Sequence, residues 1–496
     1  MNPPIGNLPR ILVAATPVLL AVALLAFGPT RAAPSAIRRA TLDLAGMLTP
    51  SPTPTLCASA AIAQTICVGI PSPTATLRSQ DKFVRLPIVQ NMAGMHFFPD
   101  TTDGIFVFND QLNTGGMTEA QFQFAAMHYV GTQKVLRDAA RHLRQYNPNF
   151  LVLHYRLGQA LGHSIPSGAC QPTTDYLQII DGDQWVQEWP GDANVQESWF
   201  FHVNSSRVFS CTNGHYLMEL NDPGWRAWWS AQVIQQLQDN EDDGVFADSY
   251  SVPNYFGACE WRPCLPDVDA TFEAEWAARE HNFTDYIRAQ FAGRWKWMPN
   301  IGALITSRDP SDYSNVDGAM IEGFAEWGGG NYFAESDWIL QMNRILPLAR
   351  ADKVLIGQTY PNPNDVQERL FVLGSYLLIK GAHTYINLDT GLDPEWFPEY
   401  ALVLGKPTDP LPVGISTYLD PTWNVYVRHY AGGMALVNPT TSARAINLGT
   451  SYYRVVPSGG GPVPDDGSAP GSLSYVATTA FTLAPHQAAI LLKQAP

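Results

Sequence analysis

The feature that most constrains the fold is an alternation of short apolar runs with helix-like segments between residues 104 and 388. Each run has the length and composition of a buried strand, and most are separated by segments with helical apolar spacing. This alternation predicts βα units and a parallel sheet, and eight units predict a (β/α)8 TIM barrel. The expected strands are residues 104–110, 126–132, 150–156, 244–250, 300–306, 318–324, 353–359 and 382–388.

The expected helices and the chain beyond residue 407 define two folded parts. Helical patterns cover 134–146, 223–238, 337–350 and 366–380, and Asp222 with Pro223 predicts a cap and first turn. After residue 407 the apolar residues alternate between turns, which is typical of antiparallel strands. We therefore expect a catalytic barrel over residues 83–406 and a small antiparallel β-sandwich domain over 407–496.

The N-terminal segment has the pattern of a targeting signal. Arg10 precedes an apolar run, Ile11 to Phe27, and small residues follow near Ala33. We interpret residues 1–33 as a cleaved secretory signal, with an uncleaved membrane anchor as the alternative. Residues 34–80 are rich in Pro, Thr and Ser and are expected to form an extended linker. Either interpretation predicts a secreted or extracytoplasmic protein, tethered to the membrane in the second case.

Six cysteines suit an exported chain, because disulfides persist in oxidising compartments. They fall into pairs that are local in sequence. The alternative is a set of free buried thiols, and the sequence alone does not fix the pairing. The candidate disulfide cysteines are Cys57 and Cys67, Cys170 and Cys211, and Cys259 and Cys264.

The charge balance limits the partners that the protein can have. The net charge is −15, from 30 basic and 45 acidic residues, and no basic patch of the kind that binds nucleic acid is evident. An acidic surface fits a neutral or cationic ligand better than a polyanion. Fourteen Trp and 20 Tyr suit core packing and also stacking on sugar rings.

Two stretches repeat one pattern, "DGVFADSY" from Asp243 and "DGAMIEGF" from Asp317. In each, Asp-Gly leads into three mostly apolar residues, and a carboxylate follows at the same offset, Asp248 or Glu322. In such barrels the reacting groups come from the C-terminal ends of strands, where both acids are expected. Asp243 and Asp317 are expected to be turn residues at the opposite end of the barrel.

Two carboxylates that face one pocket are what glycoside hydrolysis requires, one as proton donor and the other as nucleophile or base. The alternative for a single acid of this kind is a helix cap or a loop salt bridge. Glu326 is a rival for Glu322, and Trp327 is either a platform for a sugar ring or a buried core residue. The candidate substrate-binding residues are Asp110, His154, Tyr155, Tyr250, Glu326, Trp327, Gln358 and Asn387.

Other chemistries lack their sequence signals. The chain has no GxSxG, P-loop or GxGxxG motif. Its 11 histidines are scattered, with no His-x-His pair of the kind that holds a metal. We therefore expect neither a cofactor nor a metal.

The segments "GIFVFND", "ELNDPGWRAWW", "DGVFADSY", "DGAMIEGF" and "FTLAPHQAAILL", in this order along the chain, resemble a group of glycoside hydrolases with predicted barrels, over about residues 95–495. The group is distantly similar to the retaining α-galactosidase barrels. That resemblance implies Asp248 as the nucleophile and Glu322 as the acid/base. Ser249 stands where many relatives have a second acid.

The sequence thus predicts an exported glycoside hydrolase that acts on a carbohydrate polymer or oligosaccharide with retention of configuration. The alternative is a non-catalytic carbohydrate-binding or wall-associated protein on a barrel scaffold. The enzyme interpretation requires both carboxylates to reach one open site. The binding interpretation is favoured if an arginine caps either carboxylate or if the 157–222 loop covers the site.

Overall fold

A computed structural model gives the fold of the chain after residue 95. The expected signal and the whole of the expected linker lie outside the described residues, as do Cys57, Cys67, Cys170 and Cys211. In the part of the chain that is described, no helix is both long and apolar enough to cross a membrane. The described residues are 96–162, 180–181, 184–185, 194–210, 215–255, 257–391 and 394–496.

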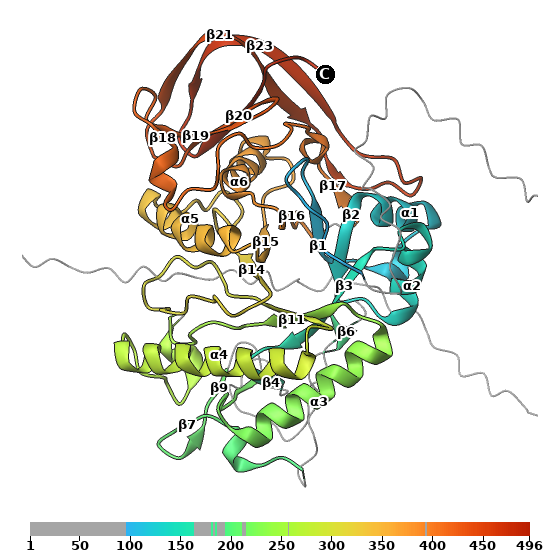
Figure 1. Ribbon diagram of the computed structural model, residues 1–496, viewed down its shortest axis with the longest axis vertical. Helices are drawn as coiled ribbons and strands as arrows, with labels where there is room; N and C mark the ends of the chain where they lie inside the picture. The colour runs from blue at the N-terminus through green and yellow to red at the C-terminus, as the bar shows by residue number, and fades with distance from the viewer. Residues whose placement is uncertain are drawn as a thin grey trace, which may run out of the picture. The chain divides into compact units, whose positions relative to one another are not determined.

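Eight parallel strands form the barrel (Figure 1). Each strand pairs with its neighbours in chain order, and a parallel bridge between Asn300 and Met320 joins the two ends of the sheet. The predicted (β/α)8 barrel is therefore confirmed. The strands are β1 (Val107–Gln111), β2 (Tyr129–Gln133), β3 (Leu151–Leu157), β11 (Gly244–Asp248), β13 (Lys296–Pro299), β14 (Gly318–Glu322), β15 (Val354–Thr359) and β16 (Thr384–Leu388).

Six helices connect consecutive barrel strands, and α3 begins with the side-chain cap that the sequence predicts. Asp222 accepts hydrogen bonds from the backbone N–H groups of Gly224 and Trp225 at the start of α3, and Pro223 is the first helical residue. The irregular segment 300–317 connects β13 to β14. The helices are α1 (Glu119–His128), α2 (Arg137–Tyr146), α3 (Pro223–Asn240), α4 (Ala270–Phe291), α5 (Glu335–Arg350) and α6 (Val366–Ile379).

The two Asp-Gly pairs lie where β11 and β14 begin. Asp243 accepts a hydrogen bond from the Val152 backbone N–H at 2.8 Å, and Asp317 accepts one from Trp297 at 3.0 Å. Each aspartate thus fixes the start of a neighbouring strand. The glycine that follows is needed for close packing, because a Cβ on Gly318 would lie 2.3 Å from the Val354 carbonyl oxygen.

The fifth strand is displaced from its expected position at 300–306. β13 is the preceding segment, Lys296–Pro299, and Asn300 is the residue at its end rather than its start. Gly302 and Leu304 have φ values of +61° and +55°, so the apolar run after Asn300 is not extended. Apolar composition alone therefore placed the strand a few residues too late.

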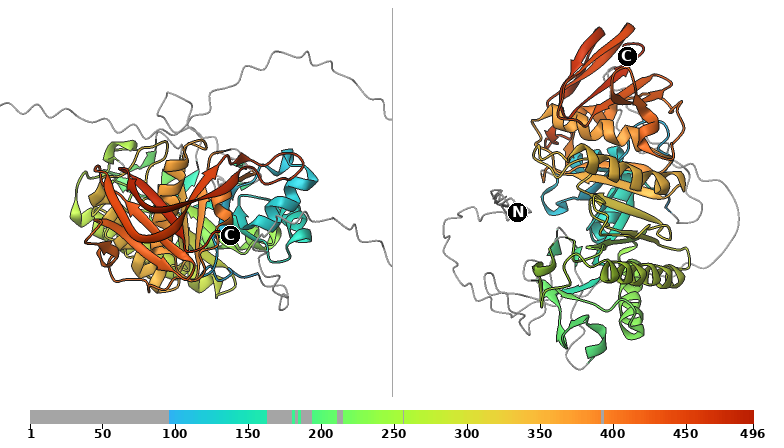
Figure 2. Two further views of the ribbon diagram at one scale, coloured as in Figure 1. Left: turned by 90° about the horizontal axis from the view of Figure 1, so that it is seen from above. Right: turned by 90° about the vertical axis from the view of Figure 1, so that its left-hand side faces the viewer.

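The C-terminal part is an antiparallel β domain, as predicted. Its strands form one sheet, whose long β21–β23 hairpin folds over the others (Figure 2) and encloses a second apolar cluster that includes Val427, Leu436 and Ile446. The other face of the sheet packs on α6, with Gly374 beside Ala488. The strands are β18 (Leu419–Asp420), β19 (Val425–Tyr430), β20 (Gly433–Asn438), β21 (Arg444–Ser458), β23 (Ser472–Leu483) and β24 (Gln487–Leu492).

The two long connections after β3 and β11 join in a second, small sheet. β4 (Ala160–Gly162), β10 (His215–Leu217) and β9 (Phe209–Ser210) come from the first connection, and β12 (Trp261–Arg262) comes from the second. Cys259 and Cys264 form a disulfide beside β12, as the sequence suggested. These connections follow strand ends that carry site residues.

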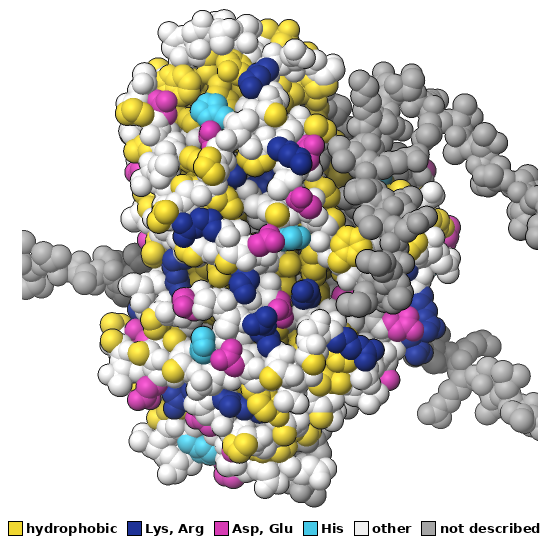
Figure 3. All heavy atoms as spheres, in the orientation of Figure 1, with side chains coloured by type: hydrophobic (Ala, Val, Ile, Leu, Met, Phe, Trp, Pro, Cys, Tyr) yellow, Lys and Arg dark blue, Asp and Glu magenta, His cyan; other side chains and the backbone are white. Residues whose placement is uncertain are grey.

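The surface in Figure 3 mixes both signs of charge. On that face Lys and Arg side chains alternate with Asp and Glu, and they are not gathered into a basic stripe. The face shown therefore offers no continuous positive surface for a polyanion.

Candidate active site

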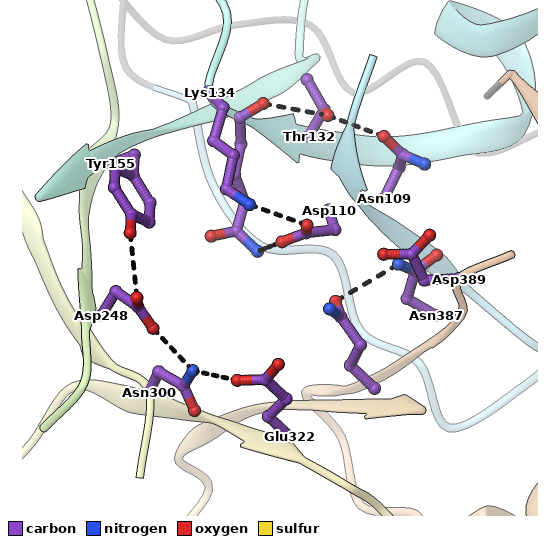
Figure 4. A network of polar contacts seen from close by, with 12 residues as sticks. Asn109, Asp110, Thr132, Lys134, Tyr155, Asp248, Asn300, Glu322, Asn387 and Asp389 are labelled. Carbon is purple, nitrogen blue, oxygen red and sulfur yellow. Dashed lines mark hydrogen bonds and ion pairs between the residues drawn. The ribbon is translucent and has the colours of Figure 1, made fainter. Parts of the chain in front are cut away.

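A ring of polar side chains forms the uppermost layer inside the barrel. The layer below it is apolar and includes Phe108, Leu153, Phe246, Met298 and Met320. Because side chains in a strand alternate between faces, the residue two positions further along each strand also points inward. On β2 a bulge shifts this alternation, and Gln133 is the inward residue that reaches Asp110. The residues of the polar ring, six of which are labelled in Figure 4, are Asp110, Gln133, Tyr155, Asp248, Asn300, Glu322, Gln358 and Asn387.

Asn300 joins the two acids of the repeated pattern. Its side-chain Nδ2 donates to Asp248 Oδ1 at 2.8 Å and to Glu322 Oε2 at 2.5 Å (Figure 4). Two oxygens that share one donor cannot be farther apart than the sum of these distances, about 5.3 Å. The two carboxylates therefore face each other across a short gap, although they lie on strands that are not neighbours.

Asp248 is held by a second donor on its other oxygen. The Tyr155 hydroxyl donates to Oδ2 at 2.9 Å, and the Ser249 hydroxyl lies 3.3 Å from the same atom. Two donors on different oxygens fix the plane of the carboxylate. The side chain is partly exposed, and in the described chain no Lys or Arg forms an ion pair with it.

Glu322 has an environment that favours its protonated form. Burial and the nearby charge of Asp248 raise the pKa of this carboxyl, while hydrogen bonds from Tyr360 and Asn300 act in the opposite direction. The Tyr360 hydroxyl donates to Oε1 from the segment after β15. A carboxyl whose pKa is raised next to one held by two donors is the asymmetry expected of an acid and a nucleophile.

The opposite wall of the ring contains an ion pair. Asp110 Oδ2 accepts from Lys134 Nζ at 2.8 Å, and its Oδ1 accepts from Gln133 Nε2 at 3.0 Å. Lys134 also lies 5.2 Å from the centre of the Tyr155 ring. Asp110 thus lies in the ring, and its partner Lys134 brings a positive charge near Tyr155, which contacts Asp248.

Two strand ends complete the ring on the side of β15 and β16. Asn387 Nδ2 donates to Gln358 Oε1 at 3.3 Å, and Gln358 Nε2 lies 3.1 Å from the Tyr360 hydroxyl oxygen. Asp389 follows β16, and burial together with the charge of Asp110 raises its pKa to about 6. These side chains present both hydrogen-bond donors and acceptors at this side of the ring.

Two predicted binding residues do not lie in the ring. His154 is fully buried, with Nε2 3.1 Å from Gln236 Oε1 on α3 and Nδ1 3.1 Å from Asp242 Oδ2. It points outward because its neighbour Tyr155 points inward. Tyr250 is also buried, and its hydroxyl donates to the Glu280 carbonyl on α4 at 2.6 Å.

Glu326 and Trp327 are also separate from the ring. Glu326 is fully buried, and burial together with the charge of Glu368 raises its pKa to about 10. Among the described residues, no hydrogen bond joins Glu326 to Glu322 or to Asp248. Trp327 packs edge-on against Phe333 and beside Gly323, so in this structure it serves the packing under the loop.

The two insertions place a histidine near Asp248. His215 on β10 is buried beside Trp261 of β12, with ring centres 5.6 Å apart. Burial lowers the pKa of His215 to about 4, and the charge of Asp248 opposes this shift. The small sheet therefore adds a neutral imidazole to the surroundings of Asp248.

Several residues of the site were missed by sequence reasoning. Asn300 was assigned to the beginning of a strand, so its position at the strand end was not recognised. Asp389 directly follows the expected strand 382–388, and this position could have identified it. Lys134 and Tyr360 lie in connections whose paths the sequence does not determine.

A barrel with two close carboxylates at the C-terminal ends of its strands has the architecture of a glycoside hydrolase. The chain belongs to hypothetical glycosyl hydrolase family 15, whose model matches residues 144–434, more than half of the sequence. Asp248 and Glu322 both lie within the matched region. Comparison with curated protein sequences gives no match.

Solved structures of glycoside hydrolases are similar to this chain at low identity. The glycoside hydrolase domain of PelA from Pseudomonas aeruginosa is 13% identical with a TM-score of 0.36, over 58% of this chain and 96% of that one. An Anoxybacillus α-amylase is 10% identical with a TM-score of 0.35, over 79% and 98%. A GH36 α-galactosidase from Geobacillus stearothermophilus is 9% identical with a TM-score of 0.32, over 80% and 56%.

Proposed function

We propose that this protein is an exported, retaining glycoside hydrolase that cleaves O-glycosidic bonds in a polysaccharide or oligosaccharide. The observation that carries the proposal is the shared donor of Asn300, which keeps Asp248 Oδ1 and Glu322 Oε2 no more than about 5.3 Å apart. Retaining enzymes have carboxyl groups about 5–5.5 Å apart, whereas inverting enzymes need about 6.5–9.5 Å to admit a water molecule.

The reaction proceeds in two displacements. Asp248 Oδ attacks the anomeric carbon, the glycosidic C–O bond breaks, and Glu322 transfers its proton to the leaving oxygen. Glu322, now ionised, removes a proton from water, and the resulting hydroxide attacks the anomeric carbon. The ester bond to Asp248 breaks, which restores both carboxyl groups to their starting states.

Two observations favour catalysis over a purely binding role. Within the described residues neither Asp248 nor Glu322 is ion-paired with an arginine, and both side chains are partly exposed.

Export is supported separately by the apolar N-terminal run and by the Cys259–Cys264 disulfide, which suits an oxidising compartment.

The proposal is tested by the configuration of the first product. We expect hydrolysis of at least one member of a panel of α- and β-linked oligosaccharides, with a product that initially has the configuration of the bond cleaved. Proton NMR during the first minutes, before mutarotation, reads this configuration directly. An inverted first product would contradict the double displacement, and a lack of cleavage across the panel would contradict hydrolysis.

Asn300→Ala should lower kcat/KM by about 10²-fold, the loss expected when reacting groups are misplaced by about 1 Å. Without the shared donor, Asp248 and Glu322 repel each other, and Glu322 loses a bond that lowers its pKa. The alkaline side of the pH–rate profile should therefore move to higher pH.

The matched control is Asn315→Ala, in the same connection. Asn315 hydrogen-bonds to His281 and Asp285 of α4, and its removal should leave the pH profile unchanged. An Asn300→Ala enzyme with an unaltered profile would show that the amide does not position the acids.

A further inference from the structure

A cavity of about 370 Å³ lies at the end of the barrel opposite the polar ring. Lys380 and Gly381, in its wall, precede β16, whereas Asn387 and Asp389 of the site lie at and beyond the other end of that strand. Arg428 of β19 closes the cavity from the C-terminal domain. The cavity is therefore independent of the proposed hydrolytic site.

Two buried cations line this cavity. Lys380 is 2% exposed and Arg428 is 1% exposed, and neither forms an ion pair with an acid in the described chain. The Lys380 ammonium donates to the Thr102 carbonyl at 3.2 Å and lies 5.9 Å from the centre of the Tyr430 ring. Lysine is almost never fully buried without a partner, because removing its charge from water is costly.

Arg428 has a structural role that leaves one donor unused. Its Nη1 lies within 3.2 Å of the carbonyl oxygens of Leu377, Leu378 and Lys380, where it caps the end of α6. Its Nη2 reaches the Asp409 carbonyl at 3.4 Å. The buried Nε has no hydrogen-bond partner among the described residues. A polar atom in this position is normally satisfied, so its partner is expected to come from outside the chain.

The acids nearby do not neutralise this pair. Asp409 lines the cavity, but its carboxylate accepts hydrogen bonds from the backbone and the ring of His429. Burial and the charge of Arg428 lower the pKa of Lys380 to about 7, against weaker opposing effects of Asp103 and Asp100. Neither cation therefore has a paired acid among the described residues.

We propose that this cavity binds an oxyanion between the Lys380 ammonium and the Arg428 guanidinium. Such a group offers strong acceptors to Arg428 Nε, which lacks one among the described residues, and to the Lys380 ammonium, which donates to one carbonyl. The volume of the cavity exceeds that of a sulfate or phosphate ion. The cavity therefore has room both for a free oxyanion and for one carried on a sugar. The bound group would stabilise the junction between the barrel and the C-terminal sheet.

Thermal unfolding of the full protein tests the proposal. Sulfate, phosphate and glucose 6-phosphate are titrated separately at constant ionic strength, with chloride as the balancing anion. Wild-type protein should show a saturable rise in Tm of about 2–4 °C. A lower half-saturating concentration for glucose 6-phosphate than for phosphate would identify a sugar-borne group, and the reverse order would identify a free ion.

Lys380→Met should abolish this rise, and without oxyanion it should be at least as stable as the wild type, because a buried charge has been removed. If Lys380 had a purely structural role, the variant would instead be less stable than the wild type, with or without the ion. The control is Lys296→Met, an exposed lysine at the start of β13, which should keep the full rise. Absence of a saturable rise in the wild type, or its persistence in Lys380→Met, would overturn the proposal.

A second arm does not depend on a variant. With sulfate, the rise in Tm of wild-type protein should shrink between pH 6 and pH 9, because Lys380 loses its proton in this range. A rise that is constant over this range would also contradict the proposal. The other charged or titratable groups around Lys380 are Asp100, Asp103, Lys406, Asp409, Tyr418, Arg428, His429 and Tyr430.

Discussion

Asp248→Asn is expected to lower kcat by about 10⁴-fold or more while the fold and the binding of the sugar are retained. The amide is nearly isosteric with the carboxylate, but it cannot form the glycosyl ester of the first displacement. Tyr155 and Asn300 would still contact the side chain, so the ring should keep its shape. The measurements are kcat on the best substrate of the panel, Tm, and calorimetric affinity for that substrate.

Two companion variants make this result specific. Asp239→Asn changes an exposed aspartate on α3 and should leave kcat within about twofold of wild type, as expected for a surface site. Asp248→Ala should regain turnover of an activated glycoside when azide is added, because the small anion can attack from the vacated position. The product should be a glycosyl azide of inverted configuration. Wild-type turnover by Asp248→Asn would remove Asp248 from the mechanism.

The barrel could be predicted because its strands are buried on both faces. Seven of the expected runs overlap the observed strands, because a continuous apolar run of this length in an α/β chain is typical of a buried parallel strand. The fifth strand was misplaced because Pro299 and Lys296 make it look unlike a buried strand. The run that follows is apolar for another reason: Ile301, Ala303 and Leu304 pack in the core without being extended.

The polar ring could be predicted only in part. Alternation along β3 requires that His154 and Tyr155 point to opposite faces, so only one of them could line the site. The sequence does not show which face is inward until the layer below is known. Asp248 and Tyr250 have the same parity, yet Tyr250 leaves the ring because Ser249 has a φ of +55° and ends the alternation.

The residues that Glu326 and Asn300 contact are distant in the sequence, and they could not be predicted for a different reason. Glu326 follows Glu322 by four residues, but Gly323 and Ala325, at φ values of +79° and +67°, turn the chain so that it meets Glu368 instead. The bridging amide of Asn300 depends on the closure of the barrel between β13 and β14, which sets the spacing of the two acids. Closure is a property of the whole sheet and of no single segment.

Glu322→Gln is expected to lower kcat/KM by about 10²–10⁴-fold on a natural oligosaccharide, the contribution of general acid catalysis. The loss should be much smaller on an aryl glycoside with an acidic leaving group, because that oxygen departs without a proton. Glu275→Gln, on an exposed carboxylate of α4, is the control and should leave both rates unchanged. A loss of equal size on the two substrates would contradict the role of Glu322 as acid.

The pH profile supplies the decisive part of this test. Glu322 donates a proton only while it is protonated, so kcat/KM of the wild type should fall as the pH rises through its pKa. Burial and the charge of Asp248 raise that pKa, so the fall should occur above the range of an ordinary glutamate. In Glu322→Gln the amide does not titrate, and this alkaline fall should disappear. An identical fall in the variant would mean that another group donates the proton.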